Sequence, residues 1–189
     1  RSKELRNIVS FLSPFDISLN KASKIYDTFG VKSMEILNET PYELCAVKGF
    51  GFLTVDKIAL KVKCKPNDKM RIRACAEYLM AEFEAKGHVY VPQQELREAC
   101  FRQLNKEFKT PAVTADEIRN ALIEEIRAGR LVNNNGLIYR PVMFECEVKL
   151  AKALTDRSFL SPREWGDVES ALERAQAERE ITLSDAQCE

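Results

Sequence analysis

The stretch Lys48-Gly49-Phe50-Gly51-Phe52 constrains the fold of this chain more than any other. Two glycines one residue apart permit a sharp turn through dihedral angles that a side chain would resist, and they leave backbone amides open to a ligand. The amphipathic run 53–63 follows directly, so the unpaired N–H groups and positive dipole end of a predicted helix adjoin the turn. The sequence therefore predicts an anion site. Phosphate is the favoured anion, because lysines flank the turn and no acidic residue lies inside it.

The candidate DNA contacts are residues of the turn and polar side chains of the following helix: Lys48, Gly49, Phe50, Gly51, Thr54, Lys57 and Lys61. Backbone amides and lysines that contact the phosphates of one strand give binding that is independent of base sequence and sensitive to salt. The aromatic residue between the two glycines is interpreted as a plug of the hairpin core rather than as a base-stacking residue. The alternative is that the glycines only make a turn in the core.

Charge is distributed unevenly along a chain whose formal net charge is zero. Eight basic residues lie between positions 48 and 73, against two acidic ones, Asp56 and Asp68: Lys48, Lys57, Lys61, Lys63, Lys65, Lys69, Arg71 and Arg73. A local basic stretch in a neutral chain is typical of a nucleic-acid footprint. A solvated helix face is the alternative.

Apolar spacing predicts short helices on the N-terminal side of the turn, over residues 5–12, 20–29 and 31–38. Gly30 stands at the usual C-cap position of the second. Another helix start is predicted at Thr40-Pro41-Tyr42-Glu43, with Thr40 as the cap, Pro41 first and Glu43 reaching back to the cap. The succession of helix, tight turn and helix resembles the helix-hairpin-helix motif of DNA repair and replication proteins.

The segment 15–25 resembles a degenerate first copy of the same unit. Asp16 stands where a glycine would be expected, and a carboxylate there would repel phosphate. This copy is therefore interpreted as a packing element. Pairing two such units would bury a four-helix core that neither could bury alone.

A second region follows the linker 65–68, and it begins with a predicted helix over 69–86 that Asp68 caps. The elements expected after it are a strand over 88–91, a helix over 93–104, a helix opened by the capping box Thr114-Ala115-Asp116-Glu117, and strands over 130–133 and 137–140 around Asn134-Asn135-Gly136. This is the order of a winged helix, from about residue 69 to 141.

In a DNA-binding winged helix, the helix before the hairpin lies in the major groove. Here that helix carries four acidic residues against Arg119 and Arg127, and the four are Asp116, Glu117, Glu124 and Glu125. Phosphate would be repelled by such a face. The composition therefore favours a structural or protein-contacting winged helix over a reader of base sequence.

The predicted fold class is mainly α, with a tandem helix-hairpin-helix domain (1–64), a winged-helix-like α+β domain (65–141) and a helical connector (142–180). Within the connector, helices are expected over 142–156 and, from Ser161-Pro162-Arg163-Glu164 onward, over 165–179. The abrupt ends of the chain predict that it is a fragment of a longer protein.

No catalytic or metal centre is indicated by the residue patterns. The six cysteines form no C-x-x-C pair and there is a single histidine, so the cysteines are interpreted as reduced thiols of a cytoplasmic protein. No Gly-x-x-x-x-Gly-Lys-Ser/Thr loop is present, and one histidine supports no Ser-His-Asp arrangement. No apolar run approaches the roughly 20 residues of a membrane span, and no signal peptide opens the chain.

Three segments together resemble the N-terminal region of the RecD-like (RecD/TraA) superfamily 1 DNA helicases. The segments are Asn38-Glu39-Thr40-Pro41-Tyr42-Glu43-Leu44, residues 48–59 around the two glycines, and Gly87-His88-Val89-Tyr90-Val91-Pro92. The ending Ile181-Thr182-Leu183-Ser184-Asp185-Ala186-Gln187 resembles the segment that precedes the phosphate-binding loop in those helicases. Phe50, Val55 and Leu53 depart from the family pattern: Phe50 replaces the usual Ile, Val55 replaces the usual Ala, and Leu53 stands where the family often has a basic residue.

The resemblance implies a parent protein that unwinds DNA 5′ to 3′ with ATP and Mg²⁺, in recombination and repair, and that is similar to exodeoxyribonuclease V alpha subunits. It implies that residues 181–189 are the start of a truncated helicase motor, which continues downstream in the same chain, and that Gln187 helps to recognise adenine. ATP and Mg²⁺ are expected for the parent only, and none for these residues. Single-stranded or forked DNA is the expected partner, and no membrane is. Two alternatives stay open: a protein-interaction scaffold, and the DNA-binding region of a repair nuclease.

Overall fold

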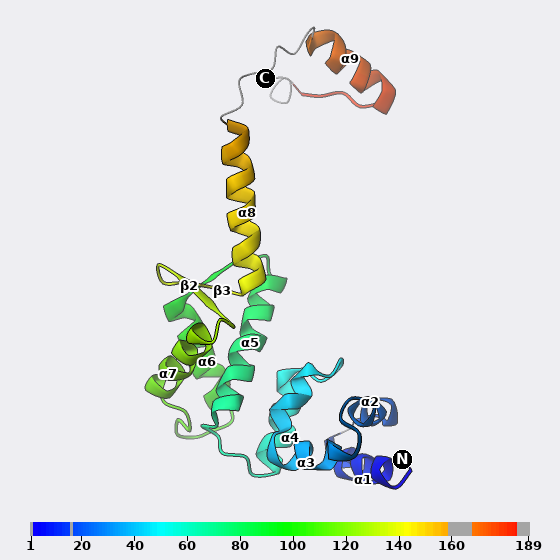
Figure 1. The fold of residues 1–189 in the computed structure, drawn as a ribbon, viewed down its shortest axis with the longest axis vertical. Helices are drawn as coiled ribbons and strands as arrows, with labels where there is room; N and C mark the ends of the chain where they lie inside the picture. Colours follow the sequence, from blue (N-terminus) through cyan, green and yellow to red (C-terminus); the bar gives the residue numbers. More distant parts are fainter. Residues whose placement is uncertain (1, 16, 159–167, 185–189) are drawn as a thin grey trace. The chain divides into compact units, whose positions relative to one another are not determined.

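A computed structural model describes residues 2–15, 17–158 and 168–184 (Figure 1). The chain is mainly α-helical and divides into two compact units, residues 1–146 and 147–189. The first unit holds a helical region and a small α+β region. The predicted fold class, a mainly α helix-hairpin-helix region followed by an α+β domain, is confirmed.

The helical region consists of short helices joined by tight turns: α1 (Ser2–Leu12), η1 (Ser13–Phe15), α2 (Leu19–Phe29), η2 (Gly30–Lys32), α3 (Ser33–Glu39), η3 (Pro41–Ala46) and α4 (Phe52–Lys61), where η marks a 3-10 helix. Helix α1 packs against α2 and α3, and α4 packs against η3. The side chains at the centre of these contacts are fully buried: Ile8, Leu12, Ile25, Leu37, Leu44, Val55 and Ile58. Gly30 ends α2 with a φ of 58°, as its position predicts.

The segment at Thr40 differs from the prediction. Pro41 takes the first position, as expected, but the turn is a 3-10 helix, and the Thr40 side chain caps nothing. The reason is that the Glu43 amide donates to the Thr40 carbonyl oxygen at 3.0 Å, so the amide that a capping box would satisfy is already paired. The predicted capping box is therefore wrong here.

The α+β region contains three helices and a three-stranded antiparallel sheet among its described residues: α5 (Lys69–Ala85), β1 (Val91–Pro92), α6 (Gln93–Asn105), α7 (Ala115–Arg127), β2 (Val132–Asn134) and β3 (Leu137–Tyr139). The strand order is β1-β3-β2, and helices α5, α6 and α7 pack on one another (Figure 1). Asn135 and Gly136 both have positive φ, 51° and 83°, which confirms the predicted Asn-Gly hairpin.

The two helix caps predicted in this region are also confirmed. Asp68 accepts a hydrogen bond from the Met70 amide at 2.7 Å. Thr114 and Glu117 form the reciprocal capping box at the start of α7. The hydrogen bonds that hold the Glu117 carboxylate, first that from the Thr114 amide, lower the pKa of Glu117 below its usual value.

Strand β1 is shorter than expected and begins later. The prediction placed a strand at residues 88–91, whereas only Val91 and Pro92 pair, with Ile138 and Leu137. His88 closes the end of α5 instead, since its amide donates to the Phe83 carbonyl oxygen at 3.1 Å and its ring meets the Phe83 ring edge-on. That cap leaves the chain free to pair only from Val91.

Helix α8 (Pro141–Ser158) begins one residue before the predicted start at 142, and Arg140 separates it from β3. The second unit holds the rest of α8 and then α9 (Val168–Arg179). Gln176 of α9 accepts a hydrogen bond from the amide of Leu183, which follows the helix, at 2.8 Å. The predicted helix start at 161–164 lies outside the described residues. In the part of the chain that the structure describes, no helix is both long and apolar enough to cross a bilayer.

Candidate nucleic-acid interface

The turn between η3 and α4 is built as the sequence predicts at one glycine and differently at the other. Gly49 has a φ of 101°, a conformation that only glycine adopts without strain. Gly51 has φ −81° and ψ 161°, which any residue can adopt, and it serves as the N-cap of α4. The prediction that both glycines are needed for their dihedral angles is therefore wrong for Gly51. A Cβ atom at Gly51 would meet nothing within 4 Å, so the backbone is open to a ligand there.

The backbone amides at this end of α4 are largely unpaired. Among the described residues, no acceptor binds the amides of Gly49, Gly51, Phe52 or Leu53. The first four N–H groups of an α-helix have no i−4 acceptor within the helix. Here the Thr54 amide donates to the Gly51 carbonyl oxygen at 3.0 Å, and Gly51 has no side chain to cap the others. The Phe50 amide is different, because it donates to the Val47 carbonyl oxygen at 2.9 Å. Four amides and the positive end of the α4 dipole thus lie together at the turn.

Phe50 is confirmed as the plug of the hairpin core, since its side chain is 2% exposed. It was predicted within the DNA-binding set, but a buried ring cannot stack on a base and its amide is already paired. The structure therefore removes Phe50 from the direct contacts. Its ring instead fixes the turn on the core.

The predicted cations separate along α4. Lys48, Lys57 and Lys61 are all exposed, and no described carboxylate pairs with them. Lys48 belongs to the turn itself, and Thr54 lies half-buried in the first turn of the helix. Lys61 is the last residue of α4, about 14 Å along the helix axis from its first residue at 1.5 Å per residue. The structure thus brings Lys48 and Thr54 to the turn and leaves Lys61 at the far end.

Lys21, a residue of α2 that the sequence reasoning missed, also reaches the turn. Its Nζ lies 6.0 Å from the centroid of the Phe50 ring. Its Cε lies 3.8 Å from the position that a Cβ atom on Gly49 would take. The resemblance between the two hairpin copies indicates this contact. When the two copies are aligned with Ala22 opposite Val55, Lys21 aligns with Thr54, which is one of the predicted DNA contacts.

The C-terminal half of the basic stretch is neutralised, contrary to the prediction of one continuous footprint. The Lys69 ammonium lies 2.7 Å from Glu124, and Arg73 lies 3.0 Å from Glu77 and 3.5 Å from Glu125. Arg71 is 1% exposed and cannot meet a ligand at the surface. These three residues stabilise the fold, and they do not belong to a DNA-binding surface.

Arg71 binds a buried carboxylate on α4. Its Nε and Nη2 donate to Oδ1 and Oδ2 of Asp56 at 2.7 and 2.9 Å, and the Tyr42 hydroxyl donates to the same Oδ1 at 2.6 Å. Nη1 also donates to the Pro66 carbonyl oxygen at 2.8 Å, and Nη2 to the Leu104 carbonyl oxygen at 3.1 Å. One side chain thus joins α4, the linker, α5 and α6.

The electrostatics of this cluster keep the Tyr42 hydroxyl protonated and the Arg71 guanidinium charged at neutral pH. Burial and the hydrogen bond to Asp56 both raise the pKa of Tyr42 far above its ordinary value. Burial alone would lower the pKa of Arg71, but the hydrogen bonds to Asp56 and the negative charge of Asp56 together outweigh burial, and the pKa rises. The cluster is therefore a structural ion pair between Arg71 and Asp56, to which Tyr42 adds a hydrogen bond.

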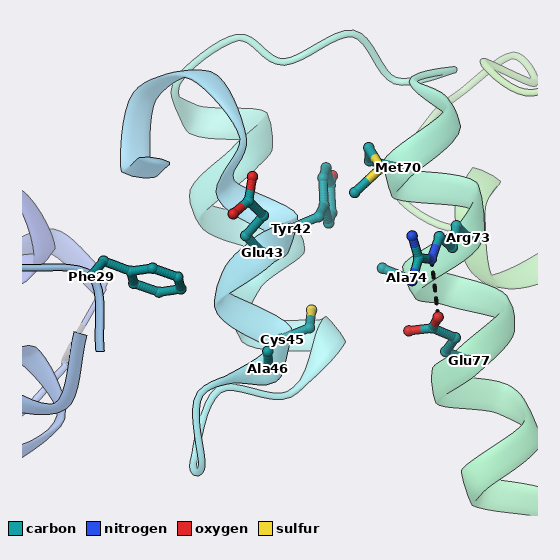
Figure 2. A pocket seen from close by; sticks show the side chains of 9 residues that line it. All are labelled: Phe29, Tyr42, Glu43, Cys45, Ala46, Met70, Arg73, Ala74 and Glu77. Atoms are coloured by element: carbon teal, nitrogen blue, oxygen red, sulfur yellow. Dashed lines mark hydrogen bonds and ion pairs between the residues drawn. The ribbon is translucent and has the colours of Figure 1, made fainter. Parts of the chain in front are cut away.

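A cavity of about 340 Å³ lies between η3 and α5 (Figure 2). It is lined by Phe29, Tyr42, Glu43, Cys45, Ala46, Met70, Arg73, Ala74 and Glu77. The Arg73–Glu77 ion pair spans about one turn of α5 on one wall, as Figure 2 shows. Burial raises the pKa of the Cys45 thiol to about 11, so the thiol is not a nucleophile at neutral pH. None of the predicted DNA contacts lines this cavity.

The acidic face predicted for α7 is largely used inside the fold. Glu125 is buried against Arg130, whose Nε and Nη2 donate to it at 2.6 and 2.7 Å. Glu117 caps its own helix, Glu124 pairs with Lys69, and Asp116 pairs with Arg119 at 3.2 Å. The face is therefore less negative than the sequence suggests. Across the described residues, no group of three or more metal-ligating side chains gathers at one place.

Comparison with known proteins agrees with this geometry. Residues 1–90 match the family model described as the helix-hairpin-helix domain of the ATP-dependent RecD2 DNA helicase. The resemblance to RecD-like helicases is confirmed. The chain is also 24% identical over 163 residues to the ATP-dependent RecD2 DNA helicase of Deinococcus radiodurans, a match that covers 79% of this chain.

Residues 1–90, which match that family model, include α1 to α4 and the turn at Gly49. The chain spans 22% of the length of the Deinococcus relative. Gln187, predicted to contact a nucleotide, lies outside the described residues.

Proposed function

We propose that this chain is an N-terminal accessory region of a DNA helicase and that the turn at Gly49 holds the sugar–phosphate backbone of DNA. The observation that carries the proposal is the group of four unpaired amides at the start of α4, beside unpaired lysines, in a domain of the RecD2 type. A phosphate oxygen accepts hydrogen bonds from such amides and is attracted by the helix dipole. Lys48 and Thr54 supply further contacts at the turn, and Lys57 and Lys61 continue the positive surface along α4.

The contact does not read bases. Amides and ammonium groups recognise phosphates, which are the same at every position, and the one aromatic residue at the tip is buried. Binding is therefore independent of sequence and falls as salt displaces the protein from the phosphates. We propose single-stranded or forked DNA as the partner.

The parent protein carries the chemistry. By analogy with the relative, whose name describes an ATP-dependent DNA helicase, the parent hydrolyses ATP with Mg²⁺, and a motor follows in the same chain with Gln187 near its nucleotide. The RecD-like resemblance supports 5′ to 3′ movement and a role in recombination and repair in the cytoplasm. The α+β region, as a winged helix, would dock on the motor rather than read DNA.

The test is a titration of labelled single-stranded DNA with the chain at two salt concentrations. Binding at low salt that weakens steeply at high salt, and that disappears when Gly49 and Gly51 both become valine, supports the proposal. If the unsubstituted chain fails to bind at low salt, or if the double variant binds equally well, the turn is not a DNA contact. In that case the protein-interaction scaffold becomes the better account of the hairpins.

A further inference from the structure

We infer that Lys21, a residue of the first hairpin copy, completes the phosphate site at the turn of the second copy. The inference rests on the proposed DNA binding and names a contact that the turn itself does not supply. It gives the first copy a part in binding, although the sequence assigned that copy to packing. The site would then be composite, with amides from one hairpin and a cation from the other.

The geometry points to a shared site because Lys21 lies over the turn and not over its own helix. Its Cε is 3.8 Å from the Cβ position of Gly49, which is ordinary van der Waals contact. The ammonium group lies over the Phe50 ring, which is itself fixed in the core. A cation held over a buried ring loses fewer rotamers on binding than one on a free side chain.

The charge of Lys21 is available to a ligand. No described carboxylate pairs with it, whereas the lysine and arginines at the start of α5 are paired or buried. A cation–π contact satisfies an ammonium only in part, because the ring offers no hydrogen-bond acceptor with a full lone pair. A phosphate oxygen at the turn would supply that acceptor. Packing alone would be served equally well by an uncharged side chain of the same length.

Lys21→Met tests this directly, because methionine keeps an unbranched apolar stem on the Phe50 ring and removes the charge. The matched control is Lys24→Met. Lys24 is an exposed residue of the same helix, and among the described contacts of the Phe50 ring it has none. Lys21→Arg is the rescue, since it restores a cation of similar reach. Binding of a labelled oligothymidylate is measured by fluorescence anisotropy across a salt series, with thermal unfolding as the check on folding.

We expect Lys21→Met to weaken binding about fivefold to tenfold at about 50 mM salt and to lower the slope of log affinity against log salt by about 0.7, the contribution of one phosphate contact on single-stranded DNA. Lys24→Met should leave the slope unchanged, and Lys21→Arg should restore it. A purely structural role would lower the melting temperature without changing the slope.

Three outcomes distinguish a failure of the composite site from a failure of the proposed DNA binding. If the unsubstituted chain binds with a steep salt dependence and Lys21→Met has the same slope, the composite site is wrong and the turn remains a DNA contact. If the unsubstituted chain shows no salt-dependent binding, both proposals are wrong. Equal losses for Lys21→Met and Lys24→Met would indicate general charge attraction and would also overturn the composite site.

Discussion

The two halves of the basic stretch look alike in the sequence and differ completely in the structure. Between Lys48 and Lys61 the lysines are exposed and unpaired among the described residues, and they lie along a helix whose first amides have no acceptor. Between Lys69 and Arg73 every cation has a carboxylate partner, and one is fully buried. Charge density alone therefore does not locate a phosphate-binding surface. The deciding property is whether the fold already supplies each cation with an anion.

The sharpest way to separate the two halves is to remove the buried cation. Arg71→Ala leaves Asp56 buried with the Tyr42 hydroxyl as its remaining partner, so the free energy of unfolding should fall by about 3–5 kcal/mol. Urea denaturation at neutral pH measures it. Lys57→Ala is the matched control from the other half, with an expected change within about 0.5 kcal/mol. Equal, small effects of the two substitutions would show that the two halves do not differ in this way.

Gly49→Val tests the unpaired half through the backbone. A β-branched residue at a φ of 101° is strained, and such strain costs about 1–3 kcal/mol, so we expect lower stability together with loss of DNA binding. Denaturation and anisotropy on the same sample measure both. The control is Gly30→Val, at a φ of 58° at the C-cap of α2, which should lose stability but keep its affinity. Equal loss of affinity in the control would attribute the effect to folding.

A charge comparison tests the two halves at the same level of burial. Lys57→Ala should lower the slope of log affinity against log salt by about 0.7 on single-stranded DNA, because it removes a cation that is free to meet phosphate. Lys69→Ala should leave that slope unchanged, because Glu124 already neutralises this lysine at 2.7 Å. If Lys69→Ala lowers the slope as much as Lys57→Ala, ion pairing does not decide which cations bind DNA.

Gly51→Ser should have the smallest effect on stability and the most specific effect on binding. The φ and ψ of Gly51 suit any residue, and serine is a better N-cap than glycine. The free energy of unfolding should therefore stay equal or rise by about 0.3 kcal/mol. The serine oxygen would occupy the helix amides that a phosphate needs, so DNA affinity should fall. Gain of stability with unchanged affinity would show that those amides do not hold the DNA.

Local features were predictable because they depend on a few neighbouring residues. The Asn135-Gly136 hairpin needs two positive φ angles, the capping box needs Thr114 and Glu117 three residues apart, and Gly30 ends a helix by its own conformational freedom. Each is decided within one turn of chain. The same holds for the tight turn at Gly49 and for the exposed lysine beside it.

Contacts between distant residues were not predictable, and they changed the interpretation of the site. The sequence counted Arg71 as a surface cation, whereas pairing with Asp56, fifteen positions earlier, buries it. The sequence assigned Glu125 to an exposed acidic face, whereas Arg130 and Arg73 neutralise it inside the fold. It left out Lys21, because only the packing of α2 against the turn brings that side chain to Gly49.

The amino-acid sequence alone determined the mainly α class, the tight turn, its flanking lysines and the resemblance to RecD-like helicases. The tertiary structure alone decided which cations are free, which glycine is needed for its dihedral angles, and that Phe50 points into the core. The physical reason is that the residue type fixes the charge or the ring of an ionic or aromatic side chain but does not fix which partner that side chain contacts. Its role depends on the nearest opposite charge or cavity in space, which can lie many residues away along the chain.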